Sequence, residues 1–158
     1  MKTATKAADN MFCKARYEAA RFNERLSSRE GASEELGIDR TRLARIELGV
    51  LTPYPEEVVL MAAAYRAPEL RLQYCKTLCP LGKNFPLIQD ATLDRISLEA
   101  LSSFRKISRA KDLLLDITED GIIDESEVDD LKSIVRTLEE VGRVTEQLKC
   151  WIEKNIDG

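Results

Sequence analysis

"SSREGASEELGIDRTRLARIELG", Ser27–Gly49, decides the fold, because it carries the start and stop signals of two short helices with a tight turn between them. Ser28 is a good N-cap for the first helix, and Gly37 can adopt the left-handed conformation that ends it and lets the chain reverse. Asp39 can then cap a second helix over residues 40–48. This order of signals predicts a helix-turn-helix.

Apolar side chains at suitable positions support that prediction, because they would hold the two helices against each other. These positions are Ala32, Leu36, Ile38, Leu43 and Ile46. The side chains that remain on the outside of the second helix are Arg40, Thr41, Arg42, Ala44 and Arg45. Three arginines on one short helix in an acidic chain raise the question of what they bind.

The N-terminal face of the second helix enters the DNA major groove in this motif, so we expect it to read bases. Arg40 and Arg45 can each bond guanine O6 and N7 as a fork, and the methyl groups of Thr41 and Ala44 can meet a thymine methyl. Arg42 is placed to meet a phosphate. The alternative is that these side chains only form a solvated charged surface. That is the better explanation for an arginine-rich helix that has no other feature of the motif.

The helix start near Ser28 and Arg29 should also help to bind phosphates, since backbone amides and the positive end of the helix dipole lie there. A second helix start, near Glu56, offers the same amides. Its two glutamates, Glu56 and Glu57, work against phosphate binding and suit helix capping.

The rest of the chain also reads as helix, so the predicted fold class is all-α. Apolar residues recur at helical spacing, no alternating β-rich run occurs, and aromatic residues make up only 6% of the 158 residues. Proline- and glycine-bearing breaks at residues 49–55 and 79–86 separate the helices. We expect a five-helix domain over residues 1–83 and a second domain over residues 84–158.

The second domain is predicted to be an antiparallel helical hairpin that turns at Asp120-Gly121. Its first helix carries apolar residues with the spacing of a seam, at Leu93, Ile96, Ala100, Phe104, Ile107, Leu114 and Ile117. Its second helix carries Val128, Leu131, Val135, Leu138, Val141, Leu148 and Ile152. Two such helices make a thin core, so they should dock either on the first domain or on a second copy; packing within the chain and a dimer seam remain equally open.

Charge separates the two domains. Residues 1–83 hold 14 Lys+Arg and 11 Asp+Glu, a net +3, whereas residues 84–158 hold 10 and 17, a net −7, which together give −4. The acidic hairpin would weaken non-specific attraction to DNA.

Residues 10–82 resemble the Cro and phage-repressor (XRE) family of helix-turn-helix regulators. The likeness is carried by "NMFCKAR", "ASEELGIDRTRLARIELG", "PEEVVLMAAAY" and "APELRLQYCKTLCPLGK", the last typical of a branch found on prophages and conjugative elements of Firmicutes. The resemblance implies a lambda-repressor-like domain and a structural ion pair between Arg16 and Glu47. Extra residues, "RFNERL", between the first two helices depart from the family pattern and leave Arg21 as a rival partner for Glu47.

Two stretches offer other chemistry. "DITEDGIIDESE", Asp116–Glu127, matches a calcium loop except at Thr118, but it also reads as a turn followed by a capping residue, Asp124 or Ser126, which we favour. Cys13, Cys75 and Cys79 could approach one another, yet with no histidine in the chain they are better explained as small packing residues than as a metal site. We expect no cofactor and no metal.

No nucleophile lies beside a base and no phosphate-binding glycine loop occurs, so we do not expect an enzyme. No apolar run approaches the length of a membrane span, and no signal peptide is recognisable, which predicts a cytoplasmic protein. The predicted function is a sequence-specific regulator of double-stranded DNA, a repressor that dimerises through the hairpin and reads a palindrome. The alternative is a protein-interaction or assembly module on a helix-turn-helix scaffold.

Overall fold

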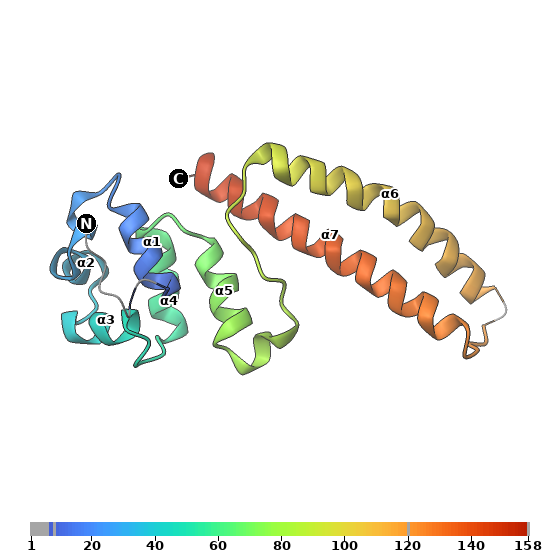
Figure 1. The fold of residues 1–158 in the computed structure, drawn as a ribbon, viewed down its shortest axis with the longest axis horizontal. Helices are drawn as coiled ribbons and strands as arrows, with labels where there is room; N and C mark the ends of the chain where they lie inside the picture. The colour runs from blue at the N-terminus through green and yellow to red at the C-terminus, as the bar shows by residue number, and fades with distance from the viewer. Residues whose placement is uncertain (1–6, 8, 120, 158) are drawn as a thin grey trace. The chain divides into compact units, whose positions relative to one another are not determined.

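The computed structural model describes residue 7 and residues 9–119 and 121–157, and every regular element within them is a helix (Figure 1). The predicted all-α class, with a long helical pair at the C-terminal end, is confirmed. The chain divides into two compact units, Met1–Phe85 with Glu153–Gly158, and Pro86–Ile152. None of the described helices is both long and apolar enough to span a membrane.

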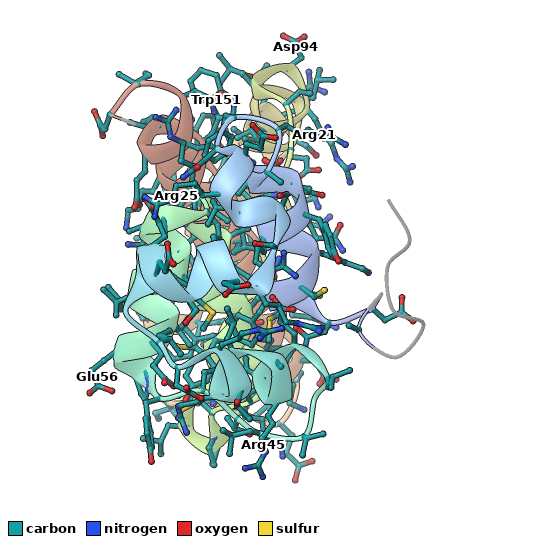
Figure 2. All side chains as sticks on the ribbon, turned by 90° about the vertical axis from the view of Figure 1, so that its left-hand side faces the viewer. Arg21, Arg25, Arg45, Glu56, Asp94 and Trp151 are labelled. Carbon is teal, nitrogen blue, oxygen red and sulfur yellow. The ribbon has the colours of Figure 1, made fainter. Side chains whose placement is uncertain are left out.

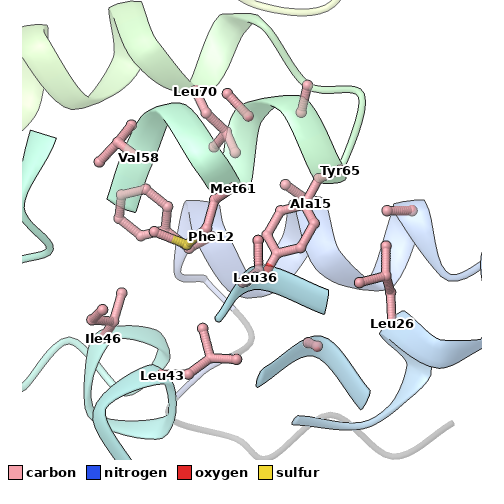
Figure 3. Close-up of a cluster of buried hydrophobic side chains, with 14 of the residues drawn as sticks. Phe12, Ala15, Leu26, Leu36, Leu43, Ile46, Val58, Met61, Tyr65 and Leu70 are labelled. Carbon is pink, nitrogen blue, oxygen red and sulfur yellow. The ribbon is translucent and has the colours of Figure 1, made fainter. Parts of the chain in front are cut away.

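The described part of the first unit contains five complete α-helices and two short 3-10 helices. They are α1 (Met11–Ala19), η1 (Glu24–Ser27), α2 (Arg29–Leu36), α3 (Arg40–Glu47), α4 (Pro55–Ala64), α5 (Glu69–Thr77) and η2 (Pro80–Asn84). The apolar faces of α1 to α5 and of η1 meet in one core, in which Phe12, Leu43 and Met61 are fully buried (Figure 3). One face of α3 packs on this core, and its opposite face is exposed.

The signals read from the sequence act where we expected them. The Ser28 hydroxyl accepts from the Gly31 amide at 3.0 Å, and Gly37 ends α2 at φ 65°, a region that glycine enters without steric cost. The Asp39 carboxylate accepts from the Arg42 amide at 2.9 Å and so caps α3. The α2–turn–α3 arrangement is therefore a helix-turn-helix.

The second unit contains the hairpin, α6 (Leu93–Thr118) and most of α7 (Glu127–Asn155), which run antiparallel side by side (Figure 1). Asp120 of the predicted turn lies outside the described residues. The Asp124 carboxylate accepts from the Ser126 and Glu127 amides at 2.7 and 3.1 Å, directly before α7. Asp124 therefore takes the capping role that the sequence analysis favoured over a calcium loop.

The predicted seam of the hairpin is wrong in its details. On α6 the buried residues are Ile96, Ser103, Ala110 and Ile117, spaced seven apart. On α7 they are Ile134, Val144 and Gln147. Phe104, Val135 and Leu138, all predicted seam residues, are more than half exposed. The small side chains of Ser103 and Ala110 let the two helices approach closely, and larger apolar residues remain outside.

Candidate nucleic-acid interface

The exposed face of α3 is the centre of the candidate site. Arg40, Thr41 and Arg45 are exposed, and Ala44 is half-buried beside them. Arg45 projects away from the helix at the surface (Figure 2). The four predicted base-reading residues therefore share one accessible face, and Leu43 and Ile46 anchor the opposite face in the core.

Arg40 and Arg45 have no acidic partner among the described residues. Arg16, Arg29 and Arg42, by contrast, all bond carboxylates. The guanidinium groups of Arg40 and Arg45 thus keep their donors available, which a ligand with paired acceptors requires.

Arg42, for which we predicted a phosphate contact, bonds a carboxylate of the chain itself. Its Nε and Nη2 donate to Glu57 Oε1 and Oε2 at 2.5 and 2.8 Å, and its guanidinium stacks over the Tyr54 ring at 4.4 Å. These hydrogen bonds from Arg42 hold the pKa of Glu57 below its ordinary value, and they raise the pKa of Arg42. Arg42 therefore links α3 to the start of α4.

The start of α4 is likewise capped by a side chain of the protein itself. The Glu57 carboxylate also accepts from the Tyr54 amide at 2.7 Å, so it caps α4 and brings negative charge there. Glu56 is exposed next to it and points outward (Figure 2). The start of α4 thus has two carboxylates in its first turn, whereas the start of α2 has one, Glu30, beside the exposed Ser28, so α4 offers the poorer anion site.

A buried ion pair fixes the end of α3. Arg16 Nε and Nη2 donate to Glu47 Oε1 and Oε2 at 2.5 and 3.0 Å, and both side chains are at most 1% exposed. Burial disfavours the charged form of Arg16, but the hydrogen bonds and charge of Glu47 outweigh it and raise the pKa. The pair implied by the family resemblance is therefore present.

Glu47 has a second partner that the sequence analysis missed. Arg29 Nε donates to Glu47 Oε2 at 2.7 Å, so one donor of a residue predicted to bind phosphate is used by this carboxylate. Arg21, the rival considered for Glu47, is exposed and directed outward (Figure 2). Arg29 is the first residue of α2 and is half-buried. Its bond to Glu47 could have been predicted only from the closeness of α2 to the end of α3.

Cys13 lies buried close to this ion pair, and burial, followed by the negative charge of Glu47, raises the pKa of its thiol. Its thiolate form is therefore disfavoured, which suits a packing residue better than a metal ligand. Cys75 and Cys79 are half-buried, and the described residues include no group of three or more Cys, Asp or Glu side chains arranged to hold a metal ion.

Comparison with known proteins adds no assignment to this geometry. Searches against models of protein families, curated proteins and solved structures gave no match.

Proposed function

We propose that this chain is a sequence-specific DNA-binding regulator of the Cro and phage-repressor type, a cytoplasmic repressor without catalytic activity. The observation that carries the proposal is the exposed pair Arg40 and Arg45, which have no acidic partner among the described residues, on a capped α3 beside Arg16, Arg29 and Arg42, which all bond carboxylates. Such a helix offers its guanidinium forks to base edges and not to the protein itself.

Each residue of the site takes a role in this proposal. Arg40 and Arg45 read guanine, and Thr41 and Ala44 contact thymine methyl groups. Ser28 and the first amides of α2 bind a phosphate. Arg29 and Arg42 act mainly by fixing α3 through Glu47 and Glu57. One recognition helix contacts few base pairs, so two copies on a two-fold symmetric site are needed for tight binding.

The test is selection from a randomised duplex pool by the full chain, at low and at physiological salt. The proposal predicts a two-fold symmetric motif that survives the higher salt. Arg40→Ala and Arg45→Ala should each weaken binding to that motif by about 5–150-fold. Arg25→Ala is the matched control, because it removes the same charge from an exposed residue paired with Glu34, and it should change binding by less than about threefold.

A second candidate, a protein-interaction module, is favoured by exposed apolar residues around the end of α3 and on α4. Val50 and Tyr54 are 64% and 63% exposed, and Val59 is 55% exposed. Enrichment of no sequence, with binding that disappears at physiological salt, would reject DNA reading and favour this candidate.

A further inference from the structure

A hollow of about 400 Å³ lies between the two helices of the hairpin, and a volume of this size suits a small molecule. Its apolar lining comes from Ala110 and Ile134 of the small core of this unit, and from Leu113, which packs against that core. Its polar lining consists of basic side chains of α6, and of hydroxyl groups and one carboxylate of α7. These residues are Arg105, Lys106, Arg109, Asp130, Ser133 and Thr137.

Two of the lining arginines, Arg105 and Arg109, are exposed and have no acidic partner among the described residues. The other basic side chains of the hairpin are paired, apart from Arg136, which lines a different hollow with Val128 and Val135. The paired residues are Arg95, Lys106, Lys111, Lys132, Arg143 and Lys149. In a half of the chain where carboxylates are in excess, two neighbouring arginines thus keep their charge free of a counter-charge.

The register of the hairpin brings these arginines opposite the hydroxyl groups of α7. Both lie on the same side of α6, because residues four positions apart are neighbours on a helix. Lys106 Nζ lies 2.8 Å from Glu140 Oε2, so these two residues are level with each other. Since the helices run antiparallel, Arg109 is level with Thr137, and Ser133 lies one turn from Thr137 on the same side of α7.

The hydrogen-bond donors around the hollow are available to a ligand. Each guanidinium group carries five N–H donors, and no hydrogen bond joins the side chain of Arg105, Arg109 or Ser133 to another described residue. Thr137 differs, because its hydroxyl donates to the Ser133 carbonyl at 3.1 Å. Asp130, the carboxylate of the lining, lies about two turns of α7 from Thr137 and so at the other end of the hollow.

We propose that this hollow binds a small organic phosphate, with the phosphate group between Arg105 and Arg109. A guanidinium fork matches two phosphate oxygens, and the Ser133 hydroxyl can donate to a third. The two free positive charges match the charge of about −1.5 to −2 that a phosphomonoester carries at pH 7. The organic group of the ligand covers Leu113 and extends toward the Asp130 end, where an anion would be repelled.

Titration of the full chain with phenyl phosphate, followed through the arginine Nε–Hε resonances, tests this proposal. We expect saturable binding with a dissociation constant of roughly 1 mM or tighter. Arg105→Gln and Arg109→Gln should each weaken it at least about fivefold, and Ser133→Ala by about 2–10-fold. Arg136→Gln is the matched control, because it removes the same charge from an unpaired, exposed arginine outside the hollow, and it should change binding by less than about twofold. Far-UV circular dichroism should stay unchanged in all three arginine variants.

Two other probes test the class of ligand. Inorganic phosphate lacks the ring and benzoate carries a single negative charge, so each should bind at least about fivefold more weakly than phenyl phosphate. Equal binding of either probe would overturn the assignment to an organic phosphate.

Three outcomes would overturn the site itself. These are no saturable binding up to about 10 mM phenyl phosphate, an equal loss of affinity in Arg136→Gln, and displacement of phenyl phosphate by random duplex, which would assign the hollow to the DNA backbone. The inference does not rest on DNA reading: a chain that selects a DNA sequence but binds no phenyl phosphate would reject this site alone.

Discussion

Removal of the Glu47 carboxylate is the strongest perturbation that the first unit offers. Glu47 accepts three hydrogen bonds, two from Arg16 and one from Arg29, and it is fully buried. Glu47→Ala leaves the Arg16 guanidinium, 1% exposed, without its counter-charge. Breaking a buried pair in this way costs about 3–5 kcal/mol, a large part of the roughly 5–15 kcal/mol by which a domain is stable.

The assay must report on the first unit alone, since the two units need not unfold together. Native-state hydrogen exchange at the Leu43 and Ile46 amides does so, because both residues lie in α3 and in the core. We expect their free energy of opening to fall by about 3–5 kcal/mol in Glu47→Ala. The exposed pair Arg25–Glu34 supplies the control: Glu34→Ala should cost less than about 1 kcal/mol.

A double variant distinguishes the cost of leaving Arg16 without a counter-charge from the cost of lost packing. If the cost arises from the orphaned arginine, the double variant Arg16→Met with Glu47→Leu should recover much of it, because apolar residues of similar volume often replace a buried pair without loss. A cost for Glu47→Ala no larger than that of Glu34→Ala would refute the reasoning. A double variant as unstable as the single one would assign the role to packing at the end of α3.

Three further outcomes are expected. Gly31→Ala should destabilise the first unit by about 1–3 kcal/mol in thermal unfolding, because a Cβ there would lie 2.1 Å from the Arg25 carbonyl oxygen, whereas Gly37→Ala meets open space and should cost only about 1–2 kcal/mol through its positive φ. Hydrogen bonds from Arg143 and Arg95 hold the pKa of Glu99 below the ordinary 4.5. The contribution of Glu99 to the stability of the hairpin is therefore present above pH 4.5 and is lost as the pH falls further. An acid titration followed by Trp151 fluorescence should show this loss of stability, and in Glu99→Gln the stability should depend less on pH. Glu57→Gln should release Arg42 toward phosphates and steepen the salt dependence of binding to random duplex by about one unit of slope; an unchanged slope would show that Arg42 stays bound at the start of α4, against Tyr54.

The helix-turn-helix could be predicted because its signals are local. A cap at Ser28, a left-handed glycine at Gly37 and a cap at Asp39 each act within three or four residues, so the sequence displays them directly. Long-range ion pairs are different. Arg16, Arg21 and Arg29 are equally good donors in sequence, and only the packing of α1 and α2 around the end of α3 determines that Arg16 and Arg29 share Glu47 while Arg21 does not. The bond between Arg42 and Glu57 could not be predicted for the same reason, since Glu57 lies fifteen residues away.

The hairpin shows what a repeat of apolar residues leaves open. A seven-residue spacing establishes that a helix has an apolar side. The helix α6 has more than one such row of apolar residues, and the sequence does not say which row packs against α7. The structure places Ser103 and Ala110 inside and leaves Phe104 and Leu115 outside. A hairpin that completed its own core would gain more by burying the larger side chains, because hydrophobic stabilisation grows with the area removed from water. The two helices of the hairpin therefore meet through small side chains, and larger apolar ones stay at the surface.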